Sequence, residues 1–501
     1  MARGSTVPGL TYEAAIDSES DVIRHAEVIR EAAEFLSELE ASAPQFEQLV
    51  AHHLGLPDSQ RCSVWARKHW MSGGFNIGIP IDVLGQGVGR RVFMRIPRPH
   101  KIAEQRFPGA IEEKMRCEIG TYAYIQDDCK DIPIAHLIGF GLPGGQTFTH
   151  AKHVATYQRF FRSLQRFFCS ALRWPCPSYY INHPSPRSRG FSYILLEYVS
   201  AGAPLVSTWN KYRDDPVRRQ NLYKGISNIA ISLGQKPWPC IGSLRFLDDA
   251  TYGLHNRPLS CHIPNLENNV SERVIDTSKI YSDAHEYYMD LMAYQESRFV
   301  RQPNSVFNEH DCRAQMAVYV YTRSLLKQFS LKEPRNGPFY LTFSDENVGH
   351  FFVDENWNVT KIVDLEWVCS WPTAMSGTPY WLSALGIDQI YGKTEEDFLE
   401  IQTQYLDALR ENEDKRKASR PLSSIIKHNW DNNAFWLLHG LTSVDALFNI
   451  CRRHLLLDVM TQPGWENAAA QFDAQSDALV QRKVAEKAVY NARLKELYLS
   501  G

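Results

Sequence analysis

The order of hydrophobic and polar residues along the chain changes character near residue 200. Before it, short apolar runs of strand length alternate with single helical segments. After it, apolar residues recur mainly three and four positions apart. Short apolar runs are typical of strands, and the longer period is typical of helices. We therefore expect an α+β protein in which a small β-rich part precedes a larger, mainly helical part.

The individual elements follow from the same pattern. A helical segment is expected at 19–54, before Pro57 and Asp58. The expected strands are 77–83, 91–97, 134–139 and 193–198, with a helix at 112–125. The expected helices of the second part are 218–234, 283–299, 311–329, 395–413, 425–457 and 473–499, and 411–417 is expected to be a polar loop. Three regions result: a helical extension at 1–60, a β-rich region at 61–200 with a basic helical insert at 142–190, and a helical region at 201–501.

The stretch 341–367 combines short strands with carboxylates at their ends. Asp345 follows one apolar strand, and a strand pair at 351–353 and 359–363 leads into Asp364. Aspartate is also common in turns for purely structural reasons. Two carboxylates at adjacent strand ends nevertheless suit phosphoryl transfer, in which one Asp orients and deprotonates a hydroxyl and another holds Mg²⁺ against the phosphates. We predict these two roles for Asp345 and Asp364.

The insert has an unusual charge pattern. Residues 132–196 include no Asp or Glu, whereas Arg159, Arg162 and Arg166 recur on one face of an expected helix. Four phenylalanines form its other face. One interpretation is a helix that packs on the protein and leaves its basic face in solvent. The other is a phosphate-rich partner such as RNA, because clustered guanidinium groups bind phosphates.

Composition mainly excludes classes of protein. With 44% hydrophobic and 22% charged residues the chain is typical of a globular protein, and its net charge of −3 gives no global attraction to nucleic acid or an anionic membrane. No apolar run reaches the length of a membrane span, and no signal peptide is recognisable. The ten cysteines include no Cys-x-x-Cys pair, which fits a reducing, cytoplasmic setting without disulfides or zinc. Neither a membrane nor DNA is expected as a partner.

Several motifs occur in an order that resembles one enzyme family. They are Ser-Gly-Gly-Phe-Asn from residue 72, Phe-Met-Arg-Ile-Pro from residue 93, a helix glutamate, Glu-Tyr-Val from residue 197 and Ile-Val-Asp-Leu-Glu-Trp from residue 362. From about Trp70 to Leu455 the chain resembles the aminoglycoside phosphotransferase and choline kinase group, more narrowly its large fungal branch. The matching residues are Ser72, Gly73 and Gly74 in the phosphate loop, Arg95 in place of the usual lysine, its partner Glu118, Glu197 and Val199 in the hinge that meets adenine, the base Asp345 and the metal ligand Asp364.

The resemblance implies a protein-kinase-like, two-lobed fold with a β-rich N-lobe and a mainly helical C-lobe. It also implies that ATP and Mg²⁺ serve as cofactors. The implied reaction transfers the γ-phosphate of ATP to a hydroxyl or amine of a small molecule, in fungal secondary metabolism.

The catalytic loop departs from the family pattern. His350 stands where the family has a metal-binding Asn, and Mg²⁺ prefers oxygen ligands over an imidazole nitrogen. Glu346, beside the base, would restore an oxygen ligand if it pointed inward. We therefore group Glu346 and His350 with Asp345 as candidate catalytic residues.

This departure leaves two alternatives to a phosphotransferase. The first is a kinase fold repurposed for other chemistry without ATP or Mg²⁺, such as an arginine-containing cyclodipeptide synthase that uses aminoacyl-tRNA, bound through Arg159, Arg162 and Arg166. The second is a non-catalytic pseudokinase that serves as an interaction module.

Overall fold

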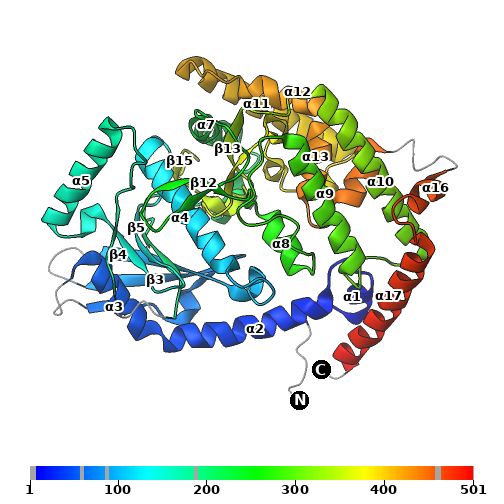
Figure 1. Cartoon of the computed structure of the whole chain (residues 1–501), viewed down its shortest axis with the longest axis horizontal. Helices are drawn as coiled ribbons and strands as arrows, with labels where there is room; N and C mark the ends of the chain where they lie inside the picture. Colours follow the sequence, from blue (N-terminus) through cyan, green and yellow to red (C-terminus); the bar gives the residue numbers. More distant parts are fainter. Residues whose placement is uncertain (1–6, 57–60, 85–89, 186–189, 457–463, 500–501) are drawn as a thin grey trace.

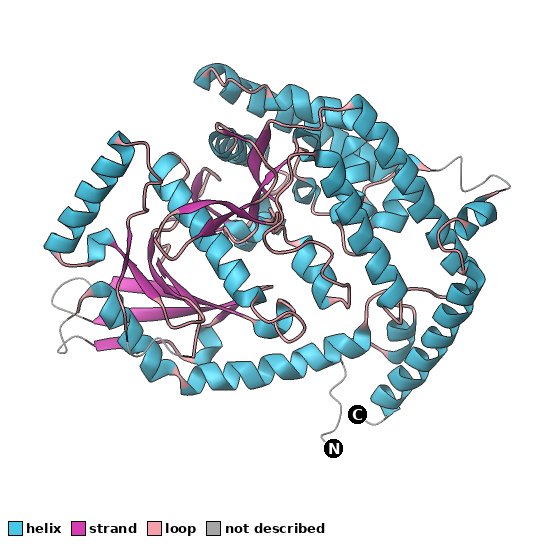
Figure 2. Ribbon diagram, in the orientation of Figure 1, coloured by secondary structure: helices cyan, strands magenta, loops and turns pink. Residues whose placement is uncertain are grey.

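The computed structural model of the chain describes residues 7–56, 61–84, 90–185, 190–456 and 464–499. Within these ranges the fold is α+β and mainly helical, as expected. Strands gather on one side and in the centre of the molecule, and helices fill the other side (Figure 2). None of the described helices has the length and apolar character needed to cross a membrane.

One antiparallel sheet organises the N-terminal part. Its strands lie in the order β1-β3-β4-β8-β5-β6-β7, and β2 pairs with β3. Three of the four expected strands are confirmed to within one residue, and the fourth starts later, at Leu137. The strands are β1 (Arg61–Val64), β2 (Met71–Ser72), β3 (Asn76–Leu84), β4 (Arg90–Pro97), β5 (Leu137–Gly141), β6 (Thr147–His150), β7 (Tyr180–Asn182) and β8 (Tyr193–Glu197).

Helices cover both faces of this sheet. Helices α2 (Val22–Ala41) and α3 (Ala43–Leu54) pack on one face, where they meet Tyr193 and Leu195 of β8. Helix α4 (Ala110–Asp128) packs on the other face against Ile194 and Leu196. Successive side chains of a strand point to opposite faces, so β8 contributes to both cores. The expected helix at 19–54 is thus two helices that break at Ser42.

The C-terminal part is mainly helical, with two small three-stranded sheets that carry the stretch 341–367. Its helices are α7 (Pro216–Leu233), α8 (His262–Asn268), α9 (Ala284–Arg301), α10 (Glu309–Lys332), α11 (Lys393–Arg416), α12 (Leu422–Asp431), α13 (Ala434–Thr442), α14 (Leu447–Ile450), α16 (Trp465–Ala470) and α17 (Ser476–Leu499). One sheet joins β10 (Pro237–Trp238), β13 (Phe339–Phe343) and β16 (Val368–Trp371), and the other joins β9 (Ala203–Pro204), β14 (Phe351–Val353) and β15 (Val359–Ile362). The strands expected in 341–367 are confirmed.

The first and last described helices pack together. Helix α2 runs along one edge of the molecule, from the large sheet to α1 (Tyr12–Ile16) and α17 (Figure 1). The Val22 N–H donates a hydrogen bond of 2.8 Å to the Tyr490 hydroxyl. The helical extension is therefore tied to the C-terminal helices as well as to the sheet.

Two expectations for the C-terminal helices are wrong. The single helix expected at 425–457 is three helices, because Asn433 adopts a left-handed conformation, φ 63°, and Ser443 is extended. Asn tolerates this conformation better than most residues. The loop expected at 411–417 is mostly helical, since α11 continues to Arg416. Glu411 pairs with Lys415 one turn later and with Lys224 of α7, at 2.6 and 2.9 Å.

The basic segment 142–190 is not a separate insert. Its first and last parts form β6 and β7 of the large sheet, and helix α5 (Thr156–Ala171) connects them. The orientation expected for this helix is also wrong. Its phenylalanines are exposed, and Arg166 turns toward the protein, where it pairs with Asp127 at 3.0 Å.

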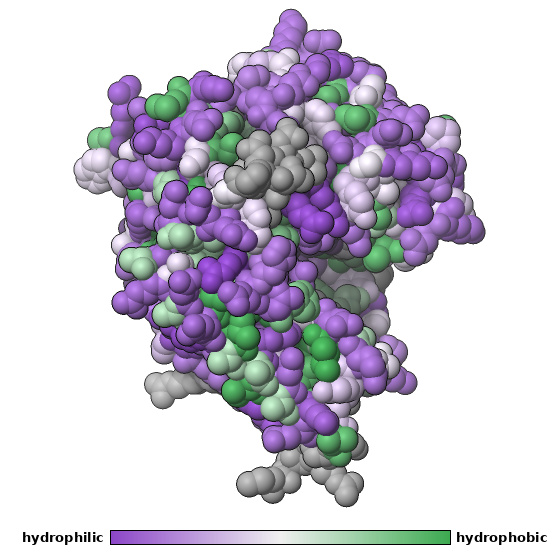
Figure 3. Space-filling model, turned by 90° about the vertical axis from the view of Figure 1, so that its right-hand side faces the viewer, coloured by the Kyte–Doolittle hydropathy of each residue, from purple (hydrophilic) through white to green (hydrophobic). Residues whose placement is uncertain are grey.

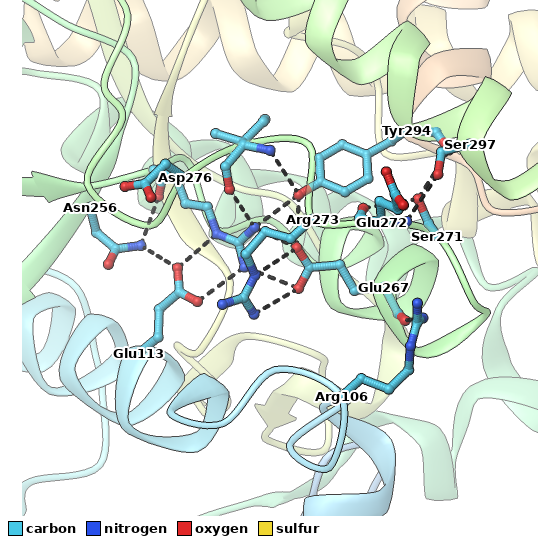
Figure 4. Close-up of polar contacts among 12 residues, drawn as sticks. Arg106, Glu113, Asn256, Glu267, Ser271, Glu272, Arg273, Asp276, Tyr294 and Ser297 are labelled. Atoms are coloured by element: carbon cyan, nitrogen blue, oxygen red, sulfur yellow. Dashed lines mark hydrogen bonds and ion pairs between the residues drawn. The ribbon is translucent and has the colours of Figure 1, made fainter.

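A buried ionic network joins α4 to the helical part (Figure 4). Arg257 lies between Glu113 of α4 and Glu267 of α8, with shortest distances of 2.8 and 2.6 Å. It also donates to the Tyr294 hydroxyl of α9 at 2.8 Å. Arg273 also pairs with Glu267, at 3.1 Å, so two cations face two carboxylates. Since the Arg257 side chain is 1% exposed, loss of either carboxylate would leave a buried positive charge in excess. The network fixes α4 relative to the C-terminal part.

Helix α4 also approaches β11 (Ser243–Phe246) very closely at Gly120. A Cβ at this residue would lie 2.9 Å from the Leu244 carbonyl oxygen. Gly120→Ala is therefore expected to lower the free energy of unfolding by about 1–3 kcal/mol, because overpacking outweighs the better helix propensity of Ala. Denaturant unfolding measures the change. Gly144→Ala is the control, since its Cβ would meet nothing within 4 Å; equal effects of the two substitutions would contradict the close approach.

Candidate functional site

The candidate site is built around a buried arginine. Arg95 of β4 donates to Glu118 of α4 and to Asp364, which follows β15, both at 2.8 Å. The two strands and the helix converge here although they lie far apart in the sequence. Arg95 and Glu118 are almost fully buried, whereas the Asp364 side chain keeps 28% exposure. Asp364 is therefore the member of this trio that can meet a ligand.

A second cation completes the cluster. Lys114, one turn before Glu118 on α4, lies 3.1 Å from that carboxylate and 2.5 Å from Glu366. Asn76 at the start of β3 donates to Glu366 at 2.6 Å and accepts from Lys114 at 3.0 Å. The amide thus joins the phosphate-loop hairpin to the turn that carries Asp364.

The cluster shifts the pKa values of two of its carboxyl groups, Asp364 and Glu366, in opposite directions. Burial acts against ionisation of Asp364, but Arg95 and His350 outweigh it and hold its pKa at about 2. Burial and the charge of Asp364 raise the pKa of Glu366 to about 8, although Lys114 and Arg95 oppose this shift. The cluster thus holds one strongly acidic carboxyl group, Asp364, and one weakly acidic one, Glu366.

The backbone at Asp364 is strained. Its φ of 68° lies in the left-handed region, which costs a non-glycine residue on the order of 1–2 kcal/mol. Such conformations persist where the surroundings enforce them, and they cluster at functional sites. Here the ion pair with Arg95 holds the side chain in place.

Asp345 lies between this cluster and a cavity. The cavity has a volume of about 180 Å³ and is lined by Asp345, Glu346, Tyr380, Trp381, Tyr405 and His439, among others. Burial raises the pKa of Asp345; the His350 ring opposes the shift, and the charge of Asp364 adds to it. A carboxylate of raised pKa at a cavity wall is a stronger base than an exposed one, which suits proton abstraction from a bound molecule.

His350 does not act as an obvious metal ligand. Its Nε2 lies 2.8 Å from the Asn347 amide nitrogen, while the Asn347 oxygen accepts from the Gly349 N–H at 2.9 Å. An acceptor role for Nε2 places the ring proton on Nδ1. The same Nε2 is 3.8 Å from Asp364 Oδ2, too far for a hydrogen bond. When it is protonated, the His350 ring lowers the pKa of both Asp345 and Asp364.

Glu346 points into the cavity and not toward Asp364. It lines the cavity with Trp381 and Tyr405, and burial raises its pKa to about 7. The structure therefore gives no support to Glu346 as the oxygen ligand that replaces the missing Asn. It lies beside Asp345 in the cavity wall, where it would contact a molecule bound in the cavity.

The residues predicted for the phosphate loop form an exposed hairpin. Ser72, Gly73 and Gly74 connect β2 to β3, and Arg98 donates to the Ser72 hydroxyl and the Gly73 carbonyl at 3.2 and 2.7 Å. Asn76, two residues on, is the part of this segment that reaches the cluster.

The two predicted hinge residues lie at and beyond the end of β8. Glu197 pairs with Lys361 of β15 at 3.0 Å, and Val199 is partly buried in the following loop. The side chain of Glu197 thus ties the large sheet to the hairpin that delivers Asp364.

The residues around Asp364 offer few ligands to a metal ion. Within the described ranges no group of three His, Cys, Asp or Glu side chains is placed to hold one. Asp364 has one carboxylate oxygen on Arg95 and the other, Oδ2, toward His350. One carboxylate is enough for Mg²⁺ only where phosphate groups of a nucleotide and water molecules supply the remaining oxygen ligands.

The three arginines predicted for RNA do not share an exposed face. Arg159 is exposed. Arg166 pairs with Asp127 and lies over the Tyr179 ring at 3.9 Å, and Arg162 Nη1 is buried. They do not form the expected common surface.

Sequence reasoning missed four residues of the site: Asn76, Lys114, Cys261 and Glu366. The Cys261 thiol faces Asp345 from the turn before α8 and gives no signal in the sequence. Lys114 precedes Glu118 by four residues, a spacing that predicts an ion pair, but its full burial is not predictable from one chain. Glu366 lies within the Ile-Val-Asp-Leu-Glu-Trp motif.

Comparison with known proteins adds no assignment: no family model matches the chain, and no curated protein does.

The pairing of Arg95 makes a first prediction for the site. Arg95→Ala is expected to lower the free energy of unfolding by about 3–5 kcal/mol, because it takes the cation from Asp364 and leaves Glu118 with Lys114 alone. Arg95→Lys is expected to recover part of this loss, since an ammonium cannot reproduce the two-sided geometry of the guanidinium. Denaturant unfolding measures both. Arg410→Ala, which removes an exposed ion pair with Asp407, is the control and should change stability by less than about 1 kcal/mol.

The raised pKa of Glu346 predicts a pH-dependent effect. Its pKa rises from 4.5 to about 7 on folding, so the folded state loses stability as the pH rises through this interval and the carboxyl group ionises at the cavity wall. Glu346→Gln is therefore expected to increase the free energy of unfolding at pH 8 by about 1–3 kcal/mol and to leave it unchanged at pH 4. Unfolding curves at both pH values test this. The exposed Glu355→Gln should show no such difference, and an equal gain at pH 4 and pH 8 would rule out ionisation as the cause.

Proposed function

We propose that the protein is a small-molecule phosphotransferase of protein-kinase-like, two-lobed fold, related to the aminoglycoside phosphotransferase and choline kinase group. The observation that carries the proposal is the position of Asp345. Its carboxyl group lines the cavity on one side and interacts with the Asp364 cluster on the other. A base between an acceptor pocket and an anion-handling cluster is what transfer of a phosphoryl group to a bound molecule requires.

Each residue of the site has a separate role in this proposal. Asp345 orients the acceptor hydroxyl or amine in the cavity and takes its proton. Asp364, whose low pKa keeps it ionised at neutral pH, provides the carboxylate for Mg²⁺. Arg95, almost fully buried between Glu118 and Asp364, holds the Asp364 carboxylate in place and lowers its pKa. When bound, ATP with Mg²⁺ supplies the phosphoryl group.

The cavity suggests the kind of acceptor. Its wall combines aromatic rings, among them Tyr380, Trp381 and Tyr405, with the carboxyl groups of Asp345 and Glu346. Aromatic faces and carboxylates together favour a small molecule with an apolar body and a hydroxyl or amine at the Asp345 end.

RNA-dependent chemistry on the same fold has less support. It relied on a common surface of Arg159, Arg162 and Arg166, and only Arg159 is exposed on α5. A phosphotransferase role relies on Arg95, Glu118, Asp345 and Asp364, which lie together.

Ligand-induced thermal stabilisation tests the proposal. At about 100 times its Kd, ATP with Mg²⁺ is expected to raise the Tm of the wild type by about 2 °C or more, because a ligand that binds only the folded state stabilises it. Mg²⁺ alone should have little effect, and Asp364→Asn should remove the metal-dependent part of the shift. Asp397→Asn, on the exposed face of α11, is the matched control and should keep the full shift. No shift of the wild type with ATP and Mg²⁺ would sink the phosphotransferase proposal.

A further inference from the structure

Helix α5 is amphipathic but is attached to the protein through its polar face. Arg166 fixes it by an ion pair with Asp127 at 3.0 Å and by a hydrogen bond to the Pro177 carbonyl at 2.5 Å. Gln158, Arg162 and Cys169 lie on the same partly buried side. None of the residues of α5 is fully buried. The helix stands at the edge of the molecule beyond the large sheet (Figure 1).

The apolar face of α5 consequently points to solvent. It comprises Tyr157, Phe160, Phe161, Leu164, Phe167 and Phe168, with exposures between 40% and 67%. We refer to these six residues as the aromatic face. A contiguous exposed apolar surface of this kind marks an interaction site, because isolated exposed apolar residues are ordinary but clusters of large ones are not.

The end of the molecule opposite α5 shows the contrast. Seen from the side of α16 and α17, the surface is mostly hydrophilic, with apolar residues in small groups (Figure 3).

The charges around the aromatic face restrict its partner. Residues 132–196 include no Asp or Glu, and Lys152, Arg159 and Arg173 are exposed at the ends and along the border of α5. Trp174 follows the helix and is 64% exposed. Trp and Tyr are the residues that prefer the interface between membrane and water, and an apolar face with basic borders is typical of helices that lie in that interface.

Two other occupants fit less well. A second copy in a symmetric dimer would bring the exposed Lys152, Arg159 and Arg173 of one copy near those of the other, and like charges repel. Single-stranded RNA stacks on aromatic side chains within a basic groove. Here the aromatic face lies on a helix at the edge of the molecule and not in a groove. Of the three arginines at 159, 162 and 166, Arg162 and Arg166 turn toward the protein.

We propose that the aromatic face of α5 binds the surface of an anionic phospholipid bilayer. The phenylalanines and Leu164 enter the boundary between headgroups and acyl chains, and Lys152, Arg159 and Arg173 meet the lipid phosphates. The protein would then act as a peripheral membrane protein, contrary to the expectation of no membrane partner that followed from the absence of a spanning segment. The proposal does not depend on the reaction at Asp345.

Vesicle flotation of the full chain tests the proposal. Vesicles of phosphatidylcholine with phosphatidylserine are expected to carry the wild type, and vesicles of phosphatidylcholine alone to carry less of it. High salt should weaken the binding, since it screens the lipid charge. The variant Phe160→Ser/Phe161→Ser/Phe167→Ser should bind at least about tenfold more weakly, because each phenylalanine no longer enters the bilayer. Lys152→Glu/Arg159→Glu should lose the preference for phosphatidylserine.

A matched control removes three exposed apolar side chains elsewhere. Val217→Ser/Leu331→Ser/Val489→Ser replaces residues that are 65%, 76% and 61% exposed on α7, α10 and α17, and it should float like the wild type. Both triple variants should keep the wild-type Tm, as none of the replaced side chains is buried.

Three outcomes would overturn the proposal. The first is that the wild type floats with neither kind of vesicle, or that the phenylalanine variant floats as well as the wild type. The second is a dimer in light scattering that the phenylalanine variant converts to a monomer, which would assign the face to a second copy. The third is binding of a single-stranded RNA oligonucleotide through these phenylalanines without vesicle binding, which would make the face a nucleic-acid surface.

Discussion

The buried pairing of Arg95 with Glu118 and Asp364 is the interaction on which the rest of the site depends. It joins a strand of the large sheet, the helix behind it and the turn after β15, three segments that local sequence contacts would not bring together. A buried guanidinium needs partners on both sides, and removal of either leaves an uncompensated charge. Lys114 and Glu366 extend the pairing, so the cluster is neutral only when Glu366 holds a proton. Asp345 lies next to this cluster, and its side chain also lines the cavity.

Both parts of the chain contribute to the candidate site. Asp345 and Asp364 come from two small sheets in the helical region, whereas Arg95, Lys114 and Glu118 come from the large sheet and α4. The network around Arg257 and the close approach at Gly120 hold α4 against the helical region. Rigid support of this kind keeps functional groups in register without a bound ligand. In our proposal the strain at Asp364 is maintained by the same support.

Much of this arrangement was predictable from the sequence, but the burial of single residues and the orientation of α5 were not. The strands of 341–367 and the strand that carries Arg95 were predicted because short apolar runs between turns identify strands well. The pairing of Arg95 with Glu118 and the place of Asp345 came from ordered motifs. Lys114 and Cys261 were missed because burial depends on contacts distant in the sequence. The predicted orientation of α5 was wrong because an amphipathic pattern shows only that one face of a helix is apolar. It does not show whether that face contacts the protein or points to solvent.

The central claim is that Asp345 serves transfer of a phosphoryl group to a small molecule. The most direct test compares the metabolites of cells that express the wild type with those of cells that express Asp345→Asn. The acceptor need not be identified before this measurement. Asp345→Asn keeps the shape of the side chain and removes the base. The account predicts a product that differs from a cellular metabolite by one phosphoryl group, is present with the wild type and is absent with Asp345→Asn. A new product without added phosphorus, or identical metabolites in the two strains, would contradict it.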